Sequence, residues 1–89
     1  MKPSPKFTGL QGQYLAFIQA YTTIHGGAPS EADMQRFFRV TPPTVHRMVL
    51  ALEQRRLIQR VPGQSRSIKL LLSSYEIPKL EGRGTDGAF

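Results

Sequence analysis

Apolar residues recur every three or four positions in the first third of the chain. This spacing places them on one face of an amphipathic helix. Thr8 suits the N-cap position and Gly26 suits a left-handed C′ position, so the pattern predicts a helix over residues 9–25. The aromatic residues of this stripe are expected to pack in a core. The stripe consists of Leu10, Tyr14, Phe17, Ile18 and Tyr21, with Ile24 as an optional continuation.

A second, shorter helix is predicted to begin after Ser30. Ser30 offers a capping hydroxyl, and Glu31 and Asp33 place acids in the first turn, where the helix dipole stabilises them. Apolar side chains follow at helical spacing, so the helix is expected to end at Phe38 or Arg39.

A third helix is predicted to start at the sequence Thr41-Pro42-Pro43. Thr41 is the expected N-cap, and Pro42 fits the first helical position, where its fixed φ is already helical. Pro43 is tolerated one step later, because the amide it lacks has no partner inside the helix. The helix is expected to end near Gln54 or Arg55. Apolar residues recur at helical spacing at Val45, Met48, Val49 and Leu52, and the inward stripe is expected to be Val45, Val49 and Leu52.

The pattern then changes from helical spacing to alternation. Residues 57–61 and 67–71 are short alternating stretches, and the residues 62–65 between them have the composition of a turn. We therefore expect a β-hairpin. Pro62 and Gly63 predict a type II turn, which requires a positive φ at the glycine.

Alternation also predicts which way the hairpin side chains point. Ile68 and Leu70 should face the core, and Lys69 between them should face solvent. Arg66 lies just past the turn, so its side chain is expected to project from the hairpin tip.

The 89 residues are enough for one domain. Residues 1–7 are expected to form a flexible arm, because two prolines prevent a helix there, and residues 8–72 to form the folded domain. Residues 73–89 lose the periodicity and carry three glycines, so this C-terminal tail is expected to be largely disordered. Three of its apolar side chains are nonetheless candidates for docking on the body or on a partner: Tyr75, Ile77 and Leu80.

Positive charge is concentrated in the second half of the predicted domain. Eight basic residues and one acid, Glu53, lie between Met34 and Leu72, which leaves that stretch at +7 while the whole chain carries +6. Seven of the eight are arginines, whose planar guanidinium suits phosphates and base edges. Because a field of one sign costs self-repulsion, this distribution indicates an anionic partner, with nucleic acid the leading candidate.

Composition argues against several other classes of protein. The chain has no cysteine, and His25 and His46 are isolated, so neither a metal nor another cofactor is expected. The sequence contains no long apolar run and no signal peptide, which favours a cytoplasmic protein without a membrane partner. It shows no Ser/His/Asp, Cys/His or paired-carboxylate arrangement, so we do not expect an enzyme.

The order of helix, short helix, tight turn, helix and hairpin predicts a mainly α fold, a three-helix winged helix-turn-helix. Its motifs resemble, in the same order along Leu10–Leu71, the DNA-binding domain of the LexA repressor family. The hairpin block is the most specific of them. The matching blocks are residues 15–18, 27–34, 44–47, 50–53 and 57–68.

The resemblance implies that the third helix enters the major groove of DNA and that the hairpin is the wing. It places the groove-reading positions on Thr41, Pro43, Thr44, His46 and Arg47. In the family a Pro-Gly-x-Ser-Arg turn builds the wing, which puts Arg66 beside the DNA backbone. With the helix N-termini and the exposed hairpin cations, the expected DNA-binding residues are Ser30, Thr41, Pro43, Thr44, His46, Arg47, Arg60, Ser65, Arg66 and Lys69.

One position departs from the family pattern. Arg56 stands where family members usually have glycine, just after the third helix. A left-handed conformation costs a residue other than glycine about 1 kcal/mol. Either the helix ends differently here, or a positive charge near DNA offsets the strain.

We therefore expect sequence-specific binding of double-stranded DNA by a transcriptional regulator, a LexA-like repressor. A winged-helix adaptor that binds another protein is the alternative. LexA proteins carry a C-terminal peptidase domain with a Ser-Lys dyad, and the chain ends at Phe89, so self-cleavage is not expected. A homodimer is also compatible with the sequence.

Overall fold

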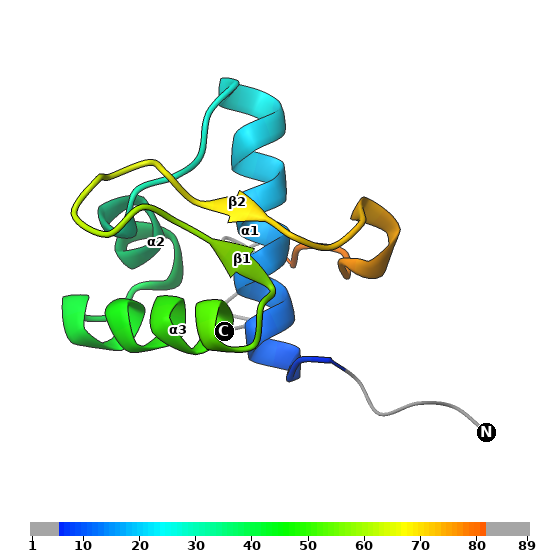
Figure 1. Ribbon diagram of the computed structural model, residues 1–89, viewed down its shortest axis with the longest axis horizontal. Coiled ribbons are helices and arrows are strands. Elements are labelled where there is room, and N and C mark those ends of the chain that lie inside the picture. Colours follow the sequence, from blue (N-terminus) through cyan, green and yellow to red (C-terminus); the bar gives the residue numbers. More distant parts are fainter. Residues whose placement is uncertain (1–5, 82–89) are drawn as a thin grey trace.

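The computed structural model describes residues 6–81 and contains the three predicted helices and the predicted hairpin. The hairpin crosses in front of α1, its loop lies on the side of α2, and a short 3₁₀ helix, η1, lies on the other side of α1 (Figure 1). Both strands are shorter than the alternating stretches that predicted them. The elements are α1 (Gly9–His25), α2 (Glu31–Phe38), α3 (Pro42–Gln54), β1 (Ile58–Gln59), β2 (Lys69–Leu70) and η1 (Ser74–Glu76).

The caps of α1 are those expected from the sequence. The Gln11 N–H donates to the Thr8 hydroxyl at 3.1 Å, and the Thr8 N–H donates to the Gln11 side chain at 3.0 Å. This reciprocal pair satisfies two amides that a helix start leaves without partners. At the other end Gly26 has a φ of 78° and donates its N–H to the Thr22 carbonyl, which stops the helix.

The start of α3 differs from expectation in one detail. Thr41 occupies the N-cap position, but its side chain makes no capping hydrogen bond. Pro43 removes one of the two amides that such a cap can bind, and the Thr41 hydroxyl lies 3.0 Å from the Thr44 hydroxyl. The proline pair thus sets the helix direction, and the two threonine hydroxyls satisfy each other.

Arg56 adopts the left-handed conformation that its position predicts, with a φ of 61°. Its N–H donates to the Glu53 carbonyl at 2.9 Å, and the Leu57 N–H donates to the Leu52 carbonyl at 3.0 Å. This pair of bonds is a Schellman ending, which satisfies the last carbonyls of α3. It also turns the chain so that Leu57 enters the core, where it is 3% exposed.

The hairpin has the predicted turn. The Gln64 N–H donates to the Val61 carbonyl at 3.0 Å, and Gly63 has a φ of 80°, as a type II turn requires. The two strands pair antiparallel, with Gln59 opposite Lys69. Lys69 faces solvent, as predicted, and Ile68 and Leu70 are partly buried against the core.

One core joins the three helices and β1. Tyr14 of α1 stacks on Phe38 of α2, with ring centroids 3.9 Å apart. The predicted stripe of α1 is partly wrong, because Leu10 is 55% exposed while Leu15 is completely buried. α1 is covered on more than one side, so its buried face is wider than a single stripe. The innermost residues are Tyr14, Leu15, Ile18, Met34, Val45, Val49, Leu52 and Ile58.

Residues 73–81 are more ordered than the predicted tail. Ile77 and Leu80, which the sequence marked as candidates for docking, pack against the core. The Gln13 side chain holds this segment from α1, donating to the Lys79 carbonyl at 3.0 Å and accepting from the Glu81 N–H at 2.8 Å. Residues 73–81 therefore belong to the folded body, and residues 82–89 of the expected tail lie outside the described residues.

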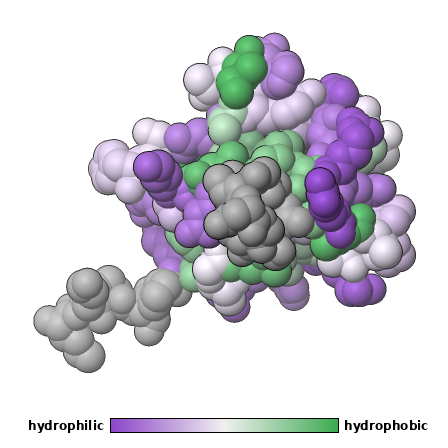
Figure 2. All heavy atoms as spheres, turned by 180° about the vertical axis from the view of Figure 1, so that it is seen from behind, coloured by the Kyte–Doolittle hydropathy of each residue, from purple (hydrophilic) through white to green (hydrophobic). Residues whose placement is uncertain are grey.

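The end of the predicted arm also contacts the body. Phe7 packs on the core, and the Lys6 ammonium lies 3.1 Å from the Glu76 carboxylate. The remaining arm residues, 1–5, lie outside the described residues. Seen from behind, apolar surface is visible in the inner part of this face, and polar side chains form much of its margin, with an apolar side chain projecting at the top (Figure 2). Of the helices among residues 6–81, none is long and apolar enough to cross a membrane.

Gly12 is the position where the docked segment approaches α1 most closely. A Cβ there would lie 2.9 Å from the Pro78 ring and 3.0 Å from the Phe7 ring. We expect Gly12→Ala to release residues 77–81, although alanine is the better helix former by about 1 kcal/mol. Amide hydrogen exchange should show faster exchange at the Glu81 N–H.

Gly9→Ala is the matched control, because nothing lies within 4 Å of a Cβ at that position of the same helix. It should leave exchange at residue 81 unchanged. A Gly12→Ala variant with a higher melting temperature and unchanged exchange would contradict the close packing.

Candidate nucleic-acid interface

A groove of about 450 Å³ runs between the start of α2, the exposed side of α3 and the hairpin loop. Five of the ten predicted DNA-binding residues line it: Ser30, His46, Arg60, Ser65 and Arg66. The other five lie outside its lining. Of these, Thr44 is half-buried, and the exposed ones are Thr41, Pro43, Arg47 and Lys69.

α3 separates its buried and exposed residues as the sequence predicts. Val45 and Val49 are completely buried, whereas His46 and Arg47 between them are exposed. Arg47 has no ion-pair partner within residues 6–81, so its guanidinium faces solvent on the first half of the helix. A helix that packs through one face and shows hydrogen-bonding side chains on the other can enter the major groove.

His46 has a partner on the neighbouring helix. Its Nδ1 atom lies 3.3 Å and 3.2 Å from the two carboxylate oxygens of Glu31. The His46 side chain remains 52% exposed and that of Glu31 34% exposed. The sequence marked Glu31 only as an acid in the first turn of α2, and its contact with His46 depends on how α2 and α3 pack.

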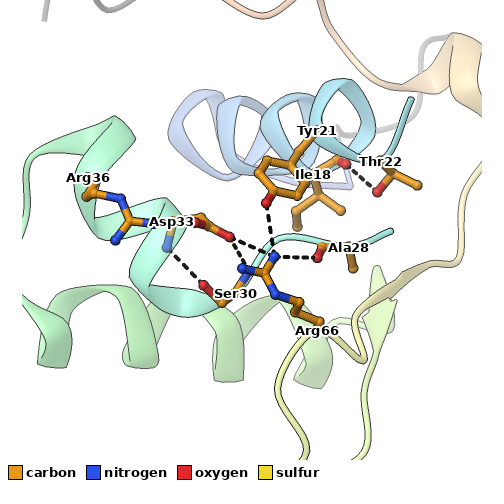
Figure 3. Close-up of polar contacts among 8 residues, drawn as sticks. All are labelled: Ile18, Tyr21, Thr22, Ala28, Ser30, Asp33, Arg36 and Arg66. Atoms are coloured by element: carbon orange, nitrogen blue, oxygen red, sulfur yellow. Dashed lines mark hydrogen bonds and ion pairs between the residues drawn. The ribbon is translucent and has the colours of Figure 1, made fainter. Parts of the chain in front are cut away.

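Arg66 points in a direction that the sequence did not predict. Instead of projecting from the hairpin tip, its side chain turns back onto the body, helped by a φ of 59° (Figure 3). One guanidinium nitrogen donates to the Tyr21 hydroxyl at 3.0 Å, the Asp33 carboxylate at 3.1 Å and the Ala28 carbonyl at 3.3 Å. The expectation that the Arg66 side chain projects from the hairpin tip is therefore wrong, because the nearly buried Asp33 carboxylate holds its guanidinium against the body, where the side chain stays 51% exposed.

Asp33 is the centre of this contact. Its side chain is only 9% exposed, and its second oxygen pairs with Arg36. The hydrogen bond from the Ser30 N–H is the largest cause that lowers the pKa of Asp33 to about 2, with the charge of Arg66 adding to it, although burial raises it. The carboxylate therefore stays ionised and joins α2 to the hairpin across the usual pH range.

Arg60 is also less available than expected. Its side chain is 16% exposed, and its Nε atom donates to the Glu53 carboxylate at 3.1 Å. The charge of Arg60 is thus balanced by the one acid of the basic stretch. Arg60 therefore joins the end of β1 to α3.

Ser30 uses its hydroxyl for the helix rather than for a ligand. The Asp33 N–H donates to the Ser30 hydroxyl at 3.1 Å, and the Ser30 N–H donates to the Asp33 carboxylate at 2.9 Å. This is the capping box that the sequence suggested only in part. Tyr21 was expected to be core packing alone, and nothing in the helical spacing indicates that its hydroxyl would reach Arg66.

Two helices joined by a tight turn, packed against a third helix and followed by a hairpin beside the second helix of the pair, define a winged helix-turn-helix domain. Residues 4–67 match the family described as the LexA DNA binding domain. The chain therefore belongs to this family, and the resemblance inferred from its motifs is confirmed.

Curated relatives agree with this assignment. The chain is 41% identical over 66 residues to the LexA repressors of Thermosipho africanus (strain TCF52B) and Thermosipho melanesiensis. Each of these alignments covers 74% of this chain and 33% of the repressor. It is 36% identical over 73 residues to the LexA repressor of Petrotoga mobilis, covering 81% of this chain and 35% of that protein. The chain spans about a third of the length of the relatives it matches.

Replacing Arg66 should destabilise the fold. Arg66→Ala removes the donor to Asp33, Tyr21 and Ala28 and leaves a nearly buried carboxylate with less compensation, so the melting temperature at pH 7 should fall. The pKa of Asp33 is lowered, so this contribution is full above its ordinary value of 3.8 and is lost as the pH falls through about 2. The difference in melting temperature between the parent and Arg66→Ala should therefore narrow as the pH falls from 3.8 to about 2.

Lys69→Ala is the control for charge alone, because Lys69 is exposed on the same hairpin and has no ion-pair partner in the described part of the chain. It should leave the melting temperature unchanged. If Arg66→Ala melts at the same temperature as the parent at pH 7, the contact with Asp33 contributes nothing to the fold.

Proposed function

We propose that this domain binds double-stranded DNA sequence-specifically and acts as a transcriptional regulator. α3 lies in the major groove, and the hairpin loop lies on the sugar-phosphate backbone. The observation that carries the proposal is the exposed face of α3, where His46 and Arg47 stand between fully buried valines and beside the hairpin loop. Membership of a DNA-binding domain family supports it.

The proposed contacts fall into two groups. Thr44, His46 and Arg47 read base edges, with Thr41 and Pro43 at the start of the same helix. Ser65, Lys69 and the free amides around Ser30 contact phosphates, which fixes the orientation of the domain without reading sequence. Arg60 and Arg66 are left out of both groups, because their charges are engaged with Glu53 and Asp33.

Exposed cations supply the attraction to DNA. Six lysine and arginine side chains are exposed and have no ion-pair partner within the described residues, namely Arg39, Arg47, Arg55, Arg56, Lys69 and Lys79. Each phosphate that such a cation neutralises releases counterions, which favours binding at low salt.

The relatives are named as repressors, and we propose that this domain also represses transcription, by binding promoter DNA. The proposed location is the cytoplasm. No catalytic step is part of this proposal. If two copies bind together, sequences selected from random DNA should be palindromic, because two-fold protein symmetry is mirrored in the binding site.

Replacing Arg47 distinguishes a contact to base edges from a contact that only raises the affinity for any DNA. A good bidentate contact to a base discriminates by about 1–3 kcal/mol. Arg47→Ala should therefore weaken binding to the selected site more than binding to random duplex, as measured by fluorescence anisotropy on both. Lys69→Ala should weaken both to a similar extent. Equal losses for Arg47→Ala would mean that Arg47 contacts phosphate only.

Salt dependence separates DNA binding from the protein-adaptor alternative. The logarithm of the binding constant should fall linearly with the logarithm of salt concentration, with a slope of about −0.9 for each phosphate contacted. The measurement is a titration of duplex DNA at several salt concentrations. Undetectable or salt-independent binding would reject the electrostatic interface and favour the adaptor.

A further inference from the structure

An acid lines the groove that we propose for DNA. Glu31 borders this groove together with His46, and its carboxylate would repel approaching phosphates. The helix dipole favours an acid in the first turn of α2 but does not require its side chain to reach another helix. The Glu31 side chain nevertheless reaches α3, where both of its oxygens lie within hydrogen-bond distance of His46 Nδ1.

The position of Glu31 is well defined. It follows Ser30, whose capping box with Asp33 fixes the start of α2. The helices that carry Glu31 and His46 pack through completely buried residues, Met34 on α2 and Val45 on α3. The core therefore fixes the relative position of the two helices that carry the carboxylate and the imidazole.

This contact determines which ring nitrogen carries the proton. An ionised carboxylate can only accept hydrogen bonds, so the His46 nitrogen that faces Glu31 must be protonated. In a neutral imidazole the other nitrogen, Nε2, then has a free lone pair and can only accept. Nε2 points in a different direction from Nδ1, and the His46 side chain is 52% exposed and borders the groove, so we infer that Nε2 can face a ligand there.

We propose that Glu31 is a positioning residue that fixes the Nδ1–H tautomer of neutral His46, so that His46 reads a base offering a hydrogen-bond donor in the major groove. Adenine N6 and cytosine N4 are such donors, whereas guanine N7 and O6 and thymine O4 are acceptors. The inference rests on the proposed function, since it assumes that α3 faces base edges. Without Glu31 either nitrogen could carry the proton, and bases of both kinds would be accepted.

The test is a selection of bound sequences from a random duplex library, carried out at about pH 8.5, above the usual titration range of imidazole. His46→Ala identifies the base position that His46 reads. The parent should enrich adenine or cytosine there. Glu31→Ala should reduce that preference roughly 3- to 10-fold, the range of one hydrogen bond, and should leave the other positions unchanged.

Glu81→Ala is the control for loss of one negative charge, because the Glu81 carboxylate has no ion-pair partner within residues 6–81 and lies outside the groove. It should keep the adenine or cytosine preference. Nitrogen-15 spectra of the free proteins give a second readout that a merely structural role would not move. His46 should show a protonated Nδ1 and an unprotonated Nε2 in the parent, and a mixture of tautomers in Glu31→Ala, while His25 stays unchanged.

The outcomes distinguish a failure of the proposed DNA-binding function from a failure of the His46 tautomer assignment. A parent that enriches no sequence would reject the proposed function and this inference with it. A parent that enriches a motif, but prefers guanine or thymine at the His46 position, would overturn the tautomer assignment alone. The same holds if Glu31→Ala keeps both the base preference and the nitrogen-15 pattern of the parent.

Discussion

The arrangement of the domain depends on one nearly buried carboxylate. Asp33 caps α2 through Ser30 and also binds Arg66, which comes from the hairpin more than thirty residues later in the chain. A carboxylate that has left water needs such partners, because an unpaired buried charge is very costly. Asp33 therefore ties the start of the helix-turn-helix to the wing, and Tyr21 of α1 joins the same contact through Arg66.

This tie is what gives the proposed DNA interface a fixed shape. The strands hold only two residues each, too little to orient a hairpin by themselves. The Arg66–Asp33 and Arg60–Glu53 contacts attach the hairpin to α2 and α3. Two arginines that charge alone would assign to DNA thus hold the wing beside the face of α3 that we propose reads bases.

The sequence predicted the elements well because their signals are local. Caps such as Thr8 and Gly26, helical spacing and the Pro62-Gly63 turn act within a few residues, so the bounds of all three helices were predictable. The destinations of long side chains were not, because they depend on packing between distant elements. Arg66 and Glu31 illustrate this: their partners lie 33 and 15 residues away, and no periodicity indicates them.

We propose that α3 and the hairpin loop form the DNA-binding face of the domain, and nuclear magnetic resonance titration with a selected duplex can locate that face. The largest amide shifts are expected around residues 41–47 of α3 and 63–67 of the loop, with little change at Ser74–Glu76. Shifts confined to η1 and the neighbouring end of the chain, with α3 unchanged, would contradict it.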